Sequence, residues 1–152
     1  MSAVPPISSF SGAHVFLSNF HPCELSFGGG MVFPSAEHAY QAAKAVDDNT
    51  ARLIASAGTA AEAKRFGRTV PLRPGWEGSK IEVMRRILRV KFGEDTALAE
   101  QLVATHPAYL IEGNTWGDKF WGCVNEGGTW VGRNELGLLL MERRNELLPG
   151  GA

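Results

Sequence analysis

Apolar side chains recur at three- and four-residue intervals along much of the chain, which is the spacing of one face of a helix. Between residues 78 and 92, for example, Ile81, Met84 and Leu88 fall on one stripe, and Gly93 follows as a stop signal. Capping residues such as Ser35 and Thr59 mark helix starts. With caps included, the pattern predicts helices over residues 35–46, 50–57, 59–67, 78–92, 95–105 and 134–147.

Short extended stretches lie between these helices, at residues 14–20, 24–27, 31–33, 109–112 and 120–124. The run Gly28–Gly30 is expected to turn the second and third of them into a small hairpin. No internal repeat or linker interrupts the pattern. We therefore predict an α+β fold, mainly α, with a few short β-strands. Residues 1–13 are expected to form a flexible lead-in, and residues 14–148 a single domain.

Composition and charge narrow the function classes. The 152 residues are 44% hydrophobic and carry a formal net charge of −1, which gives no broad basic surface for duplex DNA or a membrane. The chain has no apolar run of membrane-spanning length and no signal-peptide pattern at its start, so we expect a cytoplasmic monomer or weak homo-oligomer. Cys23 and Cys123 fit neither a disulfide framework nor a metal site, and no metal or cofactor is expected.

The segment 33–44 (FPSAEHAYQAAK) carries the clearest candidate chemistry. Glu37, Tyr40, Gln41 and Lys44 fall at i, i+3, i+4 and i+7, so they share one helix face. Glu37 and Lys44 are roughly 10 Å apart along the axis, and the lysine leans back toward the glutamate. An acid and an amine facing one cleft can open a glycosidic bond or form an imine. The same stripe also fits a solvated charged surface, and the spacing alone leaves both interpretations open.

A second candidate is the segment 116–122 (WGDKFWG). The rings of Trp116 and Trp121, beside glycines such as Gly122, suit stacking on a base or ribose. Asp118 could accept sugar hydroxyls or act as an acid–base group. The alternative is an aromatic mini-core that pins a loop.

Three smaller sets add candidates. Basic side chains that could hold a phosphate are Lys64, Arg65, Arg68 and Arg73. Trp76, with Lys80 one turn later, could close a pocket or anchor its helix. Ser18 and Asn19, followed by Phe20, need a ligand or backbone partners if they are buried. The four histidines form no ligand pattern and are expected to be structural or exposed.

In their order along the chain, these motifs resemble the NADAR family, whose best-known members are the YbiA-like N-glycosidases. The matching segments are FLSNFHP at 16–22, FPSAEHAYQAAK at 33–44, AKRFGR at 63–68, LIEGNTWGDKFWG at 110–122 and VGRNELGLLLMERR at 131–144. The resemblance implies a mainly helical fold, hydrolysis of an N-glycosidic bond to a phosphorylated ribose, and no metal. By motif, Glu37 and Lys44 look like the catalytic pair, and Asn19, Trp76, Asp118, Trp121 and Asn134 look like pocket positions. One departure, Thr105-His106 in place of an expected Thr-Gly, bears on substrate choice.

From these observations we predict an N-glycosidase. Its substrates would be phosphoribosylamino-pyrimidine intermediates of riboflavin synthesis, or ADP-ribose on guanine, including ADP-ribosylated nucleic acid. The predicted catalytic residues are Glu37, Lys44 and Asp118, and the predicted contacts are Ser18, Asn19, Phe20, Tyr40, Gln41, Arg68, Trp76, Trp116, Trp121, Gly122 and Asn134. Either Lys44 forms an imine, or Glu37 and Asp118 act as a two-carboxylate pair. The alternative function is a non-catalytic module that binds ADP-ribose or nucleotides.

Overall fold

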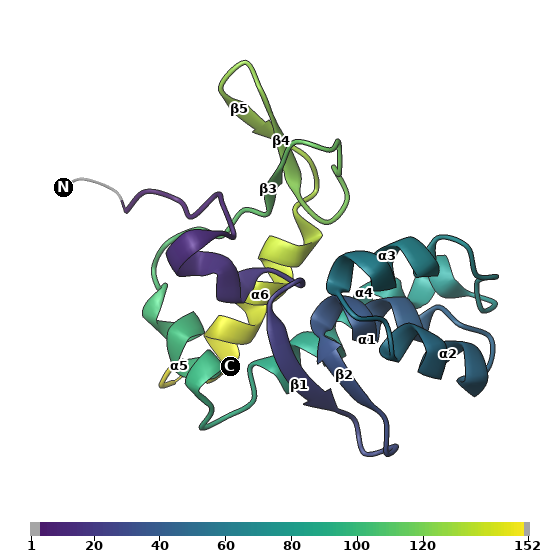
Figure 1. The fold of residues 1–152 in the computed structure, drawn as a ribbon. Coiled ribbons are helices and arrows are strands. Elements are labelled where there is room, and N and C mark those ends of the chain that lie inside the picture. The colour runs from purple at the N-terminus through teal and green to yellow at the C-terminus, as the bar shows by residue number, and fades with distance from the viewer. Residues whose placement is uncertain (1–3, 151–152) are drawn as a thin grey trace. The chain divides into compact units, whose positions relative to one another are not determined.

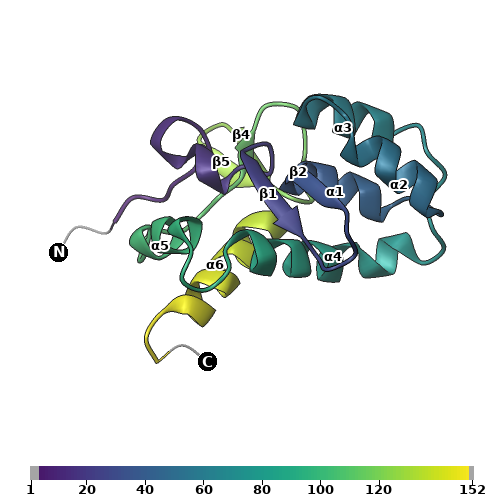
Figure 2. The same cartoon turned by 60° about the horizontal axis from the view of Figure 1, so that its bottom comes forward.

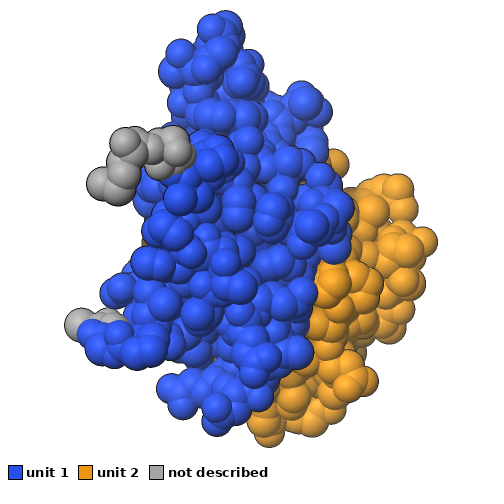
Figure 3. All heavy atoms as spheres, turned by 90° about the vertical axis from the view of Figure 1, so that its left-hand side faces the viewer, with its two compact units in different colours: residues 1–18, 92–152 blue, residues 19–91 orange. Residues whose placement is uncertain are grey.

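In the computed structural model, which describes residues 4–150, the chain forms two compact units. Unit 2 is continuous and comprises residues 19–91, whereas unit 1 joins the segment before residue 19 to the segment from residue 92 onward (Figure 3). None of the described helices is long and apolar enough to cross a membrane.

Unit 2 consists of a β-hairpin followed by helices (Figures 1 and 2). The hairpin pairs β1 (Pro22–Ser26) with β2 (Val32–Ser35) in antiparallel register. The helices are α1 (Ala36–Ala43), α2 (Asp48–Ala55), α3 (Ala60–Gly67) and α4 (Trp76–Lys91). Because α1 contacts each of the other helices as well as the hairpin, it is the central element of the unit.

Short side chains allow α1 to take this central position. Ala36 is 0% exposed, Ala39 5% and Ala42 4%, so neighbouring backbones can approach the helix closely. Ala42 also packs with Ile54 of α2 and Ala63 of α3 in a buried apolar cluster. The alanine-rich side of α1 therefore ties three helices together.

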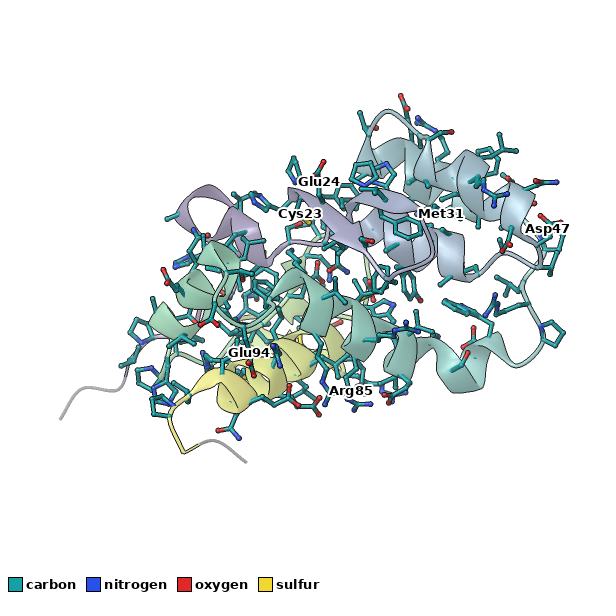
Figure 4. All side chains as sticks on the ribbon, turned by 90° about the horizontal axis from the view of Figure 1, so that it is seen from below. Cys23, Glu24, Met31, Asp47, Arg85 and Glu94 are labelled. Carbon is teal, nitrogen blue, oxygen red and sulfur yellow. The ribbon has the colours of Figure 1, made fainter. Side chains whose placement is uncertain are left out.

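Side-chain caps fix where these helices begin. Ser35, Asp47 and Thr59 each accept a backbone hydrogen bond at the start of α1, α2 and α3, respectively. Asp47, which begins α2, is labelled in Figure 4. Each cap is worth about 1 kcal/mol. The caps at Ser35 and Thr59 confirm the starts predicted for those two helices.

Unit 1 combines helices with a small mixed sheet (Figure 1). Its helical segments are the 3-10 helix η1 (Gly12–Leu17), α5 (Ala97–Ala104) and α6 (Glu135–Leu147). The sheet has the order β3 (Gly113–Asn114), β4 (Cys123–Glu126), β5 (Thr129–Val131), with β3 parallel and β5 antiparallel to β4. α5 contacts α6, and the side chains of Leu102, Leu110 and Leu140 are fully buried.

The N-terminal segment is partly paired. Within the range predicted as a lead-in, the N–H of Ile7 donates to the carbonyl of Tyr109 at 2.8 Å, and its carbonyl accepts from the N–H of Ile111 at 2.9 Å. Ile7 thereby forms a parallel bridge with Leu110. Residues 1–3 of the predicted lead-in lie outside the described residues.

The extended segment predicted over 14–20 is wrong, because residues 12–17 form the 3-10 helix η1. Phe16 and Leu17 are adjacent and both buried, at 5% and 0% exposure. A strand directs successive side chains to opposite faces, so it would not bury both on one side, whereas a tight helical turn can.

Other boundaries shift for local reasons. α1 ends at Ala43 instead of residue 46, because the carbonyl of Lys44 accepts the N–H of Arg73 and leaves the helical pattern. α5 is capped by Thr96, whose hydroxyl accepts the N–H of Ala99, and not by Asp95, whose φ of 64° is left-handed. The last two predicted strands lie further along the chain, as β3 and β4, and β5 was not predicted.

Candidate active site

The polar stripe on α1 is buried and not solvated. Glu37 is 7% exposed, Tyr40 7% and Gln41 3%, while Lys44 at the C-terminal end of the helix is half-buried. Burying charged and hydrogen-bonding side chains is costly unless they find partners. The solvated-surface interpretation is therefore wrong for the first three of these residues.

Two contacts fix Glu37 in the first turn of α1. Its backbone N–H donates to the carbonyl of Asn19 at 2.9 Å, and its carboxylate Oε2 accepts a hydrogen bond from Nε2 of Gln41 at 2.5 Å. Burial raises the pKa of Glu37, and the Gln41 hydrogen bond and the charges of Lys64 and Lys44 oppose that rise. A raised pKa keeps more of this carboxyl protonated near neutrality, which suits a proton donor.

Lys44 is the C-cap residue of α1, and its Nζ lies 5.3 Å from the centre of the Tyr40 ring. Partial burial lowers the pKa of Lys44, and the positive charges of Arg68 and Lys64 lower it further, while Glu37 opposes them. A lowered pKa increases the fraction of neutral amine, which is the form with a lone pair for nucleophilic attack.

The basic residues near Lys44 belong to different elements. Lys64 of α3 has its Nζ 5.8 Å from the centre of the Phe20 ring, and Phe20 as a residue is 42% exposed. Arg68 is the C-cap of α3. Lys80 of α4 also lowers the pKa of Lys44, although it forms an ion pair with Glu77 at 2.7 Å. A positively charged environment therefore surrounds the amine.

Arg73 of the predicted basic set and the separately predicted Trp76 have packing roles. The guanidinium of Arg73 donates to the carbonyl of Ala45 at 3.4 Å, so this arginine anchors the loop before α4. Trp76 is 4% exposed, and its ring centre lies 5.3 Å from that of Tyr40 at an angle of 54°. Trp76 therefore anchors the start of α4 against α1, which is one of the two roles predicted for it.

His38 is structural, as predicted. It is 2% exposed, and its Nε2 lies 2.9 Å from the carbonyl of Ala57, which can only accept. The proton is therefore on Nε2, and Nδ1 accepts the hydroxyl of Ser35 at 2.7 Å. The Ser35 oxygen in turn accepts the N–H of His38. His38 thus links the start of α1 to the end of α2.

In unit 1, the aromatic segment 116–122 is organised by its own hydrogen bonds. Asp118 Oδ1 accepts the backbone N–H groups of Phe120 at 3.0 Å and Trp121 at 2.9 Å. Asn114 binds both the N–H and the carbonyl of Asp118, at 2.9 and 2.8 Å. The Phe120 and Trp121 rings meet edge to face at 4.9 Å, whereas Trp116 is 64% exposed. These contacts fit the mini-core alternative for most of the loop.

The remaining predicted contacts of unit 1 also make backbone bonds. Asn134 is 5% exposed, donates to the carbonyl of Leu110 at 2.9 Å and accepts the N–H of Glu112 at 3.0 Å. It occupies the N-cap position of α6, as predicted, but its side chain makes no capping bond. Gly122 is packed so closely that an added Cβ would lie 2.0 Å from Glu112. Ser18 is the C-cap of η1.

The predicted site residues thus divide between the units. Unit 2 contains both members of the Glu37–Lys44 pair and the predicted contacts Asn19, Phe20, Tyr40, Gln41, Arg68 and Trp76. Unit 1 contains Ser18, Trp116, Asp118, Trp121, Gly122 and Asn134. Sequence reasoning missed Gly67, which lies against Gln41, because its only visible signal was that of a helix end. Among residues 4–150, no group of three or more His, Cys, Asp and Glu side chains could hold a metal ion.

Comparisons with known proteins agree on one family. A family model described as "NADAR domain" matches residues 9–148. N-glycosidase YbiA of Escherichia coli (strain K12) is 42% identical over 120 residues, which cover 78% of this chain and 72% of that protein. Riboflavin biosynthesis protein VVA0006 of Vibrio vulnificus (strain YJ016) is 43% identical over 136 residues, or 88% of this chain, and the match spans 36% of that protein's length.

A solved structure is also similar. The NMR structure of the E. coli protein YbiA aligns with a TM-score of 0.78 at 36% sequence identity, covering 96% of this chain and 87% of that one. This likeness confirms the predicted fold class, α+β and mainly α.

Proposed function

The chain belongs to the NADAR family, and on that premise we propose that it is an N-glycosidase acting on the bond between a phosphorylated ribose and a nitrogen of a base or amine. The printed names of its relatives, N-glycosidase and riboflavin biosynthesis protein, support hydrolysis of N-glycosyl bonds as the reaction class. The observation that carries the proposal is the pair on α1: a buried acid with a raised pKa and a half-buried amine with a lowered one.

The convergence of these two pKa values has a quantitative consequence. A protonated Glu37 and a neutral Lys44 are both required, which is the reverse of their usual states. With ordinary values of about 4.3 and about 10.4, only about one molecule in a million would hold that combination. The active fraction is the share of molecules in which Glu37 is protonated and Lys44 is neutral. Whenever burial and charge bring the two acidity constants tenfold closer to each other, this fraction rises tenfold. The burial of both groups, and the charge of Arg68 beside Lys44, therefore increase this active fraction, whereas Lys64 lowers both pKa values and does not narrow the gap between them.

In the proposed mechanism, the Nζ lone pair of Lys44 forms a bond to C1′ of the ribose as the bond from C1′ to the base nitrogen breaks. Glu37 delivers its proton to the departing nitrogen. As the C1′–O4′ bond breaks, one proton of the adduct nitrogen passes to the ring oxygen O4′, which converts the adduct to a protonated imine between Nζ and C1′. Water then adds to the imine carbon, releases the ribose and restores the free amine. Glu37, now a carboxylate, can accept a proton from that water.

The surroundings of the pair support a phosphorylated substrate. Lys64 and Arg68 lie close enough to Lys44 to lower its pKa, and cations at such positions can bind phosphate oxygens. Together with the riboflavin biosynthesis relatives, they favour phosphoribosylamino-pyrimidines, with ADP-ribosylated guanine as the alternative substrate.

Incubating the protein with riboflavin-pathway intermediates, ADP-ribosylated guanosine oligonucleotides and NAD, followed by mass spectrometry of the products, tests the activity and the substrate class together. Release of the free base from one of them is expected. Binding without turnover, unchanged in Glu37→Gln, would instead identify a non-catalytic reader.

Borohydride reduction during turnover tests the imine. We expect a stable sugar adduct on the wild-type protein and on Lys119→Ala, which removes an exposed lysine, but none on Lys44→Ala. If Lys44→Ala retained near-normal turnover and Asp118→Ala abolished it, the two-carboxylate route would replace the imine. The two backbone N–H groups that Asp118 Oδ1 accepts favour a loop-organising role for this residue.

A further inference from the structure

Gly67, the last residue of α3, leaves no room for a side chain beside Gln41. A Cβ on Gly67 would lie 1.9 Å from Oε1, 2.7 Å from Cδ and 3.1 Å from Cβ of Gln41. Gly67 is buried and is not among the glycines with a positive φ. The requirement for glycine at this position is therefore steric and not conformational.

The amide of Gln41 is held between Gly67 and Glu37. Its Nε2 donates to Glu37 Oε2 at 2.5 Å, and its Oε1 is buried without a conventional hydrogen-bond partner among the described residues. An oxygen so close to the Cβ position of Gly67 lies within reach of the Cα hydrogens, which are weak donors. If the Gln41 amide were turned so that its oxygen and nitrogen exchanged places, its oxygen would face the Glu37 carboxylate, and an ionised carboxylate repels an amide oxygen.

Holding the carboxylate through Oε2 leaves Oε1 of Glu37 as the oxygen that can exchange a proton with a substrate. The rotation of the carboxyl group depends on the Gln41 amide, and the position of the amide depends on the space at Gly67. A substitution at Gly67 must therefore displace Gln41 first, because no other group lies nearer to the missing Cβ.

We propose that Gly67 is a positioning residue of the active site, whose lack of a side chain seats the Gln41 amide so that it holds and aims the Glu37 carboxyl. Gln41, predicted from sequence as a substrate contact, then acts mainly through Glu37. The catalytic consequence rests on the proposed N-glycosidase function, whereas the seating of Gln41 can be measured without turnover.

The test uses the full chain with Gly67→Ala, Gln41→Ala, the double variant, and Gly78→Ala as the matched control. Gly78 is also a helical glycine, and a Cβ there would meet nothing within 4 Å. For each protein, kcat/KM is measured across pH, the pKa of Glu37 is measured by carbon NMR of its side-chain carboxyl, and thermal unfolding reports folding.

We expect Gly67→Ala to lower kcat/KM by about tenfold to a hundredfold, as small misplacements of reacting groups do. This loss is net of the opposing gain in active fraction that a raised Glu37 pKa brings. In the Gln41→Ala background, where the side chain it collides with is shortened, the same substitution should change kcat/KM less than about twofold. The pKa of Glu37 should rise in both single variants, because the Gln41 hydrogen bond that lowers it is lost, and should stay unchanged in Gly78→Ala.

Equal losses from Gly67→Ala in both backgrounds would overturn the proposal and indicate a general packing role. An unchanged Glu37 pKa in a folded Gly67→Ala protein would overturn it as well. If the wild-type protein released no base from any substrate, the proposed function would fail, but the NMR titrations would still decide the seating of Gln41.

Discussion

Lys91, the last residue of α4, is 2% exposed, and burial lowers its pKa from 10.5 to about 8, partly opposed by the nearby Cys23. Between about pH 8 and 10.5 the unfolded chain therefore binds more protons at this lysine than the folded protein does. Stability rises with pH wherever the unfolded state binds more protons. The lowering of the Lys91 pKa from 10.5 to about 8 corresponds to about 3 kcal/mol. Burying Lys91 therefore lowers the unfolding free energy by this full amount below pH 8, and the loss disappears as the pH approaches 10.5.

Urea denaturation at a series of pH values from 7 to 10.5 measures this effect. The protein with Lys91 is compared with its Lys91→Met variant. Burial raises the pKa of the Cys23 thiol, which makes stability fall as the pH rises, so both of these proteins should also carry Cys23→Ala. In that background, the unfolding free energy of the protein that retains Lys91 should gain about 3 kcal/mol across the range relative to Lys91→Met. Lys119→Met, which removes an exposed lysine, should retain the slope. If the unfolding free energy followed the same pH dependence with and without the Lys91→Met substitution, the reasoning would be refuted.

Two further predictions concern the frame that holds the site. Ser35→Ala removes the cap of α1 and the hydroxyl that donates a hydrogen bond to His38 Nδ1. It should lower the unfolding free energy, measured in urea, by about 1–2 kcal/mol. An unchanged urea midpoint would contradict the capping role. Ile54→Ala opens a cavity in the buried cluster that Ile54 forms with α1, and it should lower the unfolding free energy by about 2–5 kcal/mol. The control is the neighbouring Leu53→Ala, at a residue that is 58% exposed, which should change the unfolding free energy by no more than about 0.5 kcal/mol. Similar losses in both variants would contradict the role of the cluster.

The parts of the site that sequence could predict are those set by local spacing. Glu37, Gln41 and Lys44 share a face because they lie on one helix, and the cap at Ser35 fixes where that helix begins. Burial of that face could not be predicted, since the same spacing fits a solvated stripe and only packing against other helices decides between them. The 3-10 helix at Phe16 and Leu17 was missed for the same reason, because burial of two adjacent side chains depends on the surrounding core.

Lys64, Gly67 and Arg68 show how tertiary contacts complete a pattern that is local in sequence. They lie at i, i+3 and i+4 near the end of α3, so they share one face, and α3 contacts α1. From that face, Lys64 lowers the pKa of Glu37 and of Lys44 alike, whereas Gly67 acts on Glu37 through Gln41. On this face, Lys64 therefore provides the positive charge that acts on α1, and Gly67 leaves the room that Gln41 of α1 occupies.

The different roles of Lys64 and Gly67 can be told apart by their effects on the pH dependence of kcat/KM. Lys64→Met keeps the apolar stem but removes a positive charge that favours proton loss from both groups, so the pKa values of Glu37 and Lys44 should rise together. Both limbs of the kcat/KM profile should then move to higher pH together. The plateau between them should fall only as far as KM for the phosphorylated substrate rises, because the gap between the two pKa values, which sets the active fraction, is kept. Gly67→Ala should move the lower limb alone. If Lys64→Met moved only one limb, the assignment of the two limbs to Glu37 and Lys44 would be wrong.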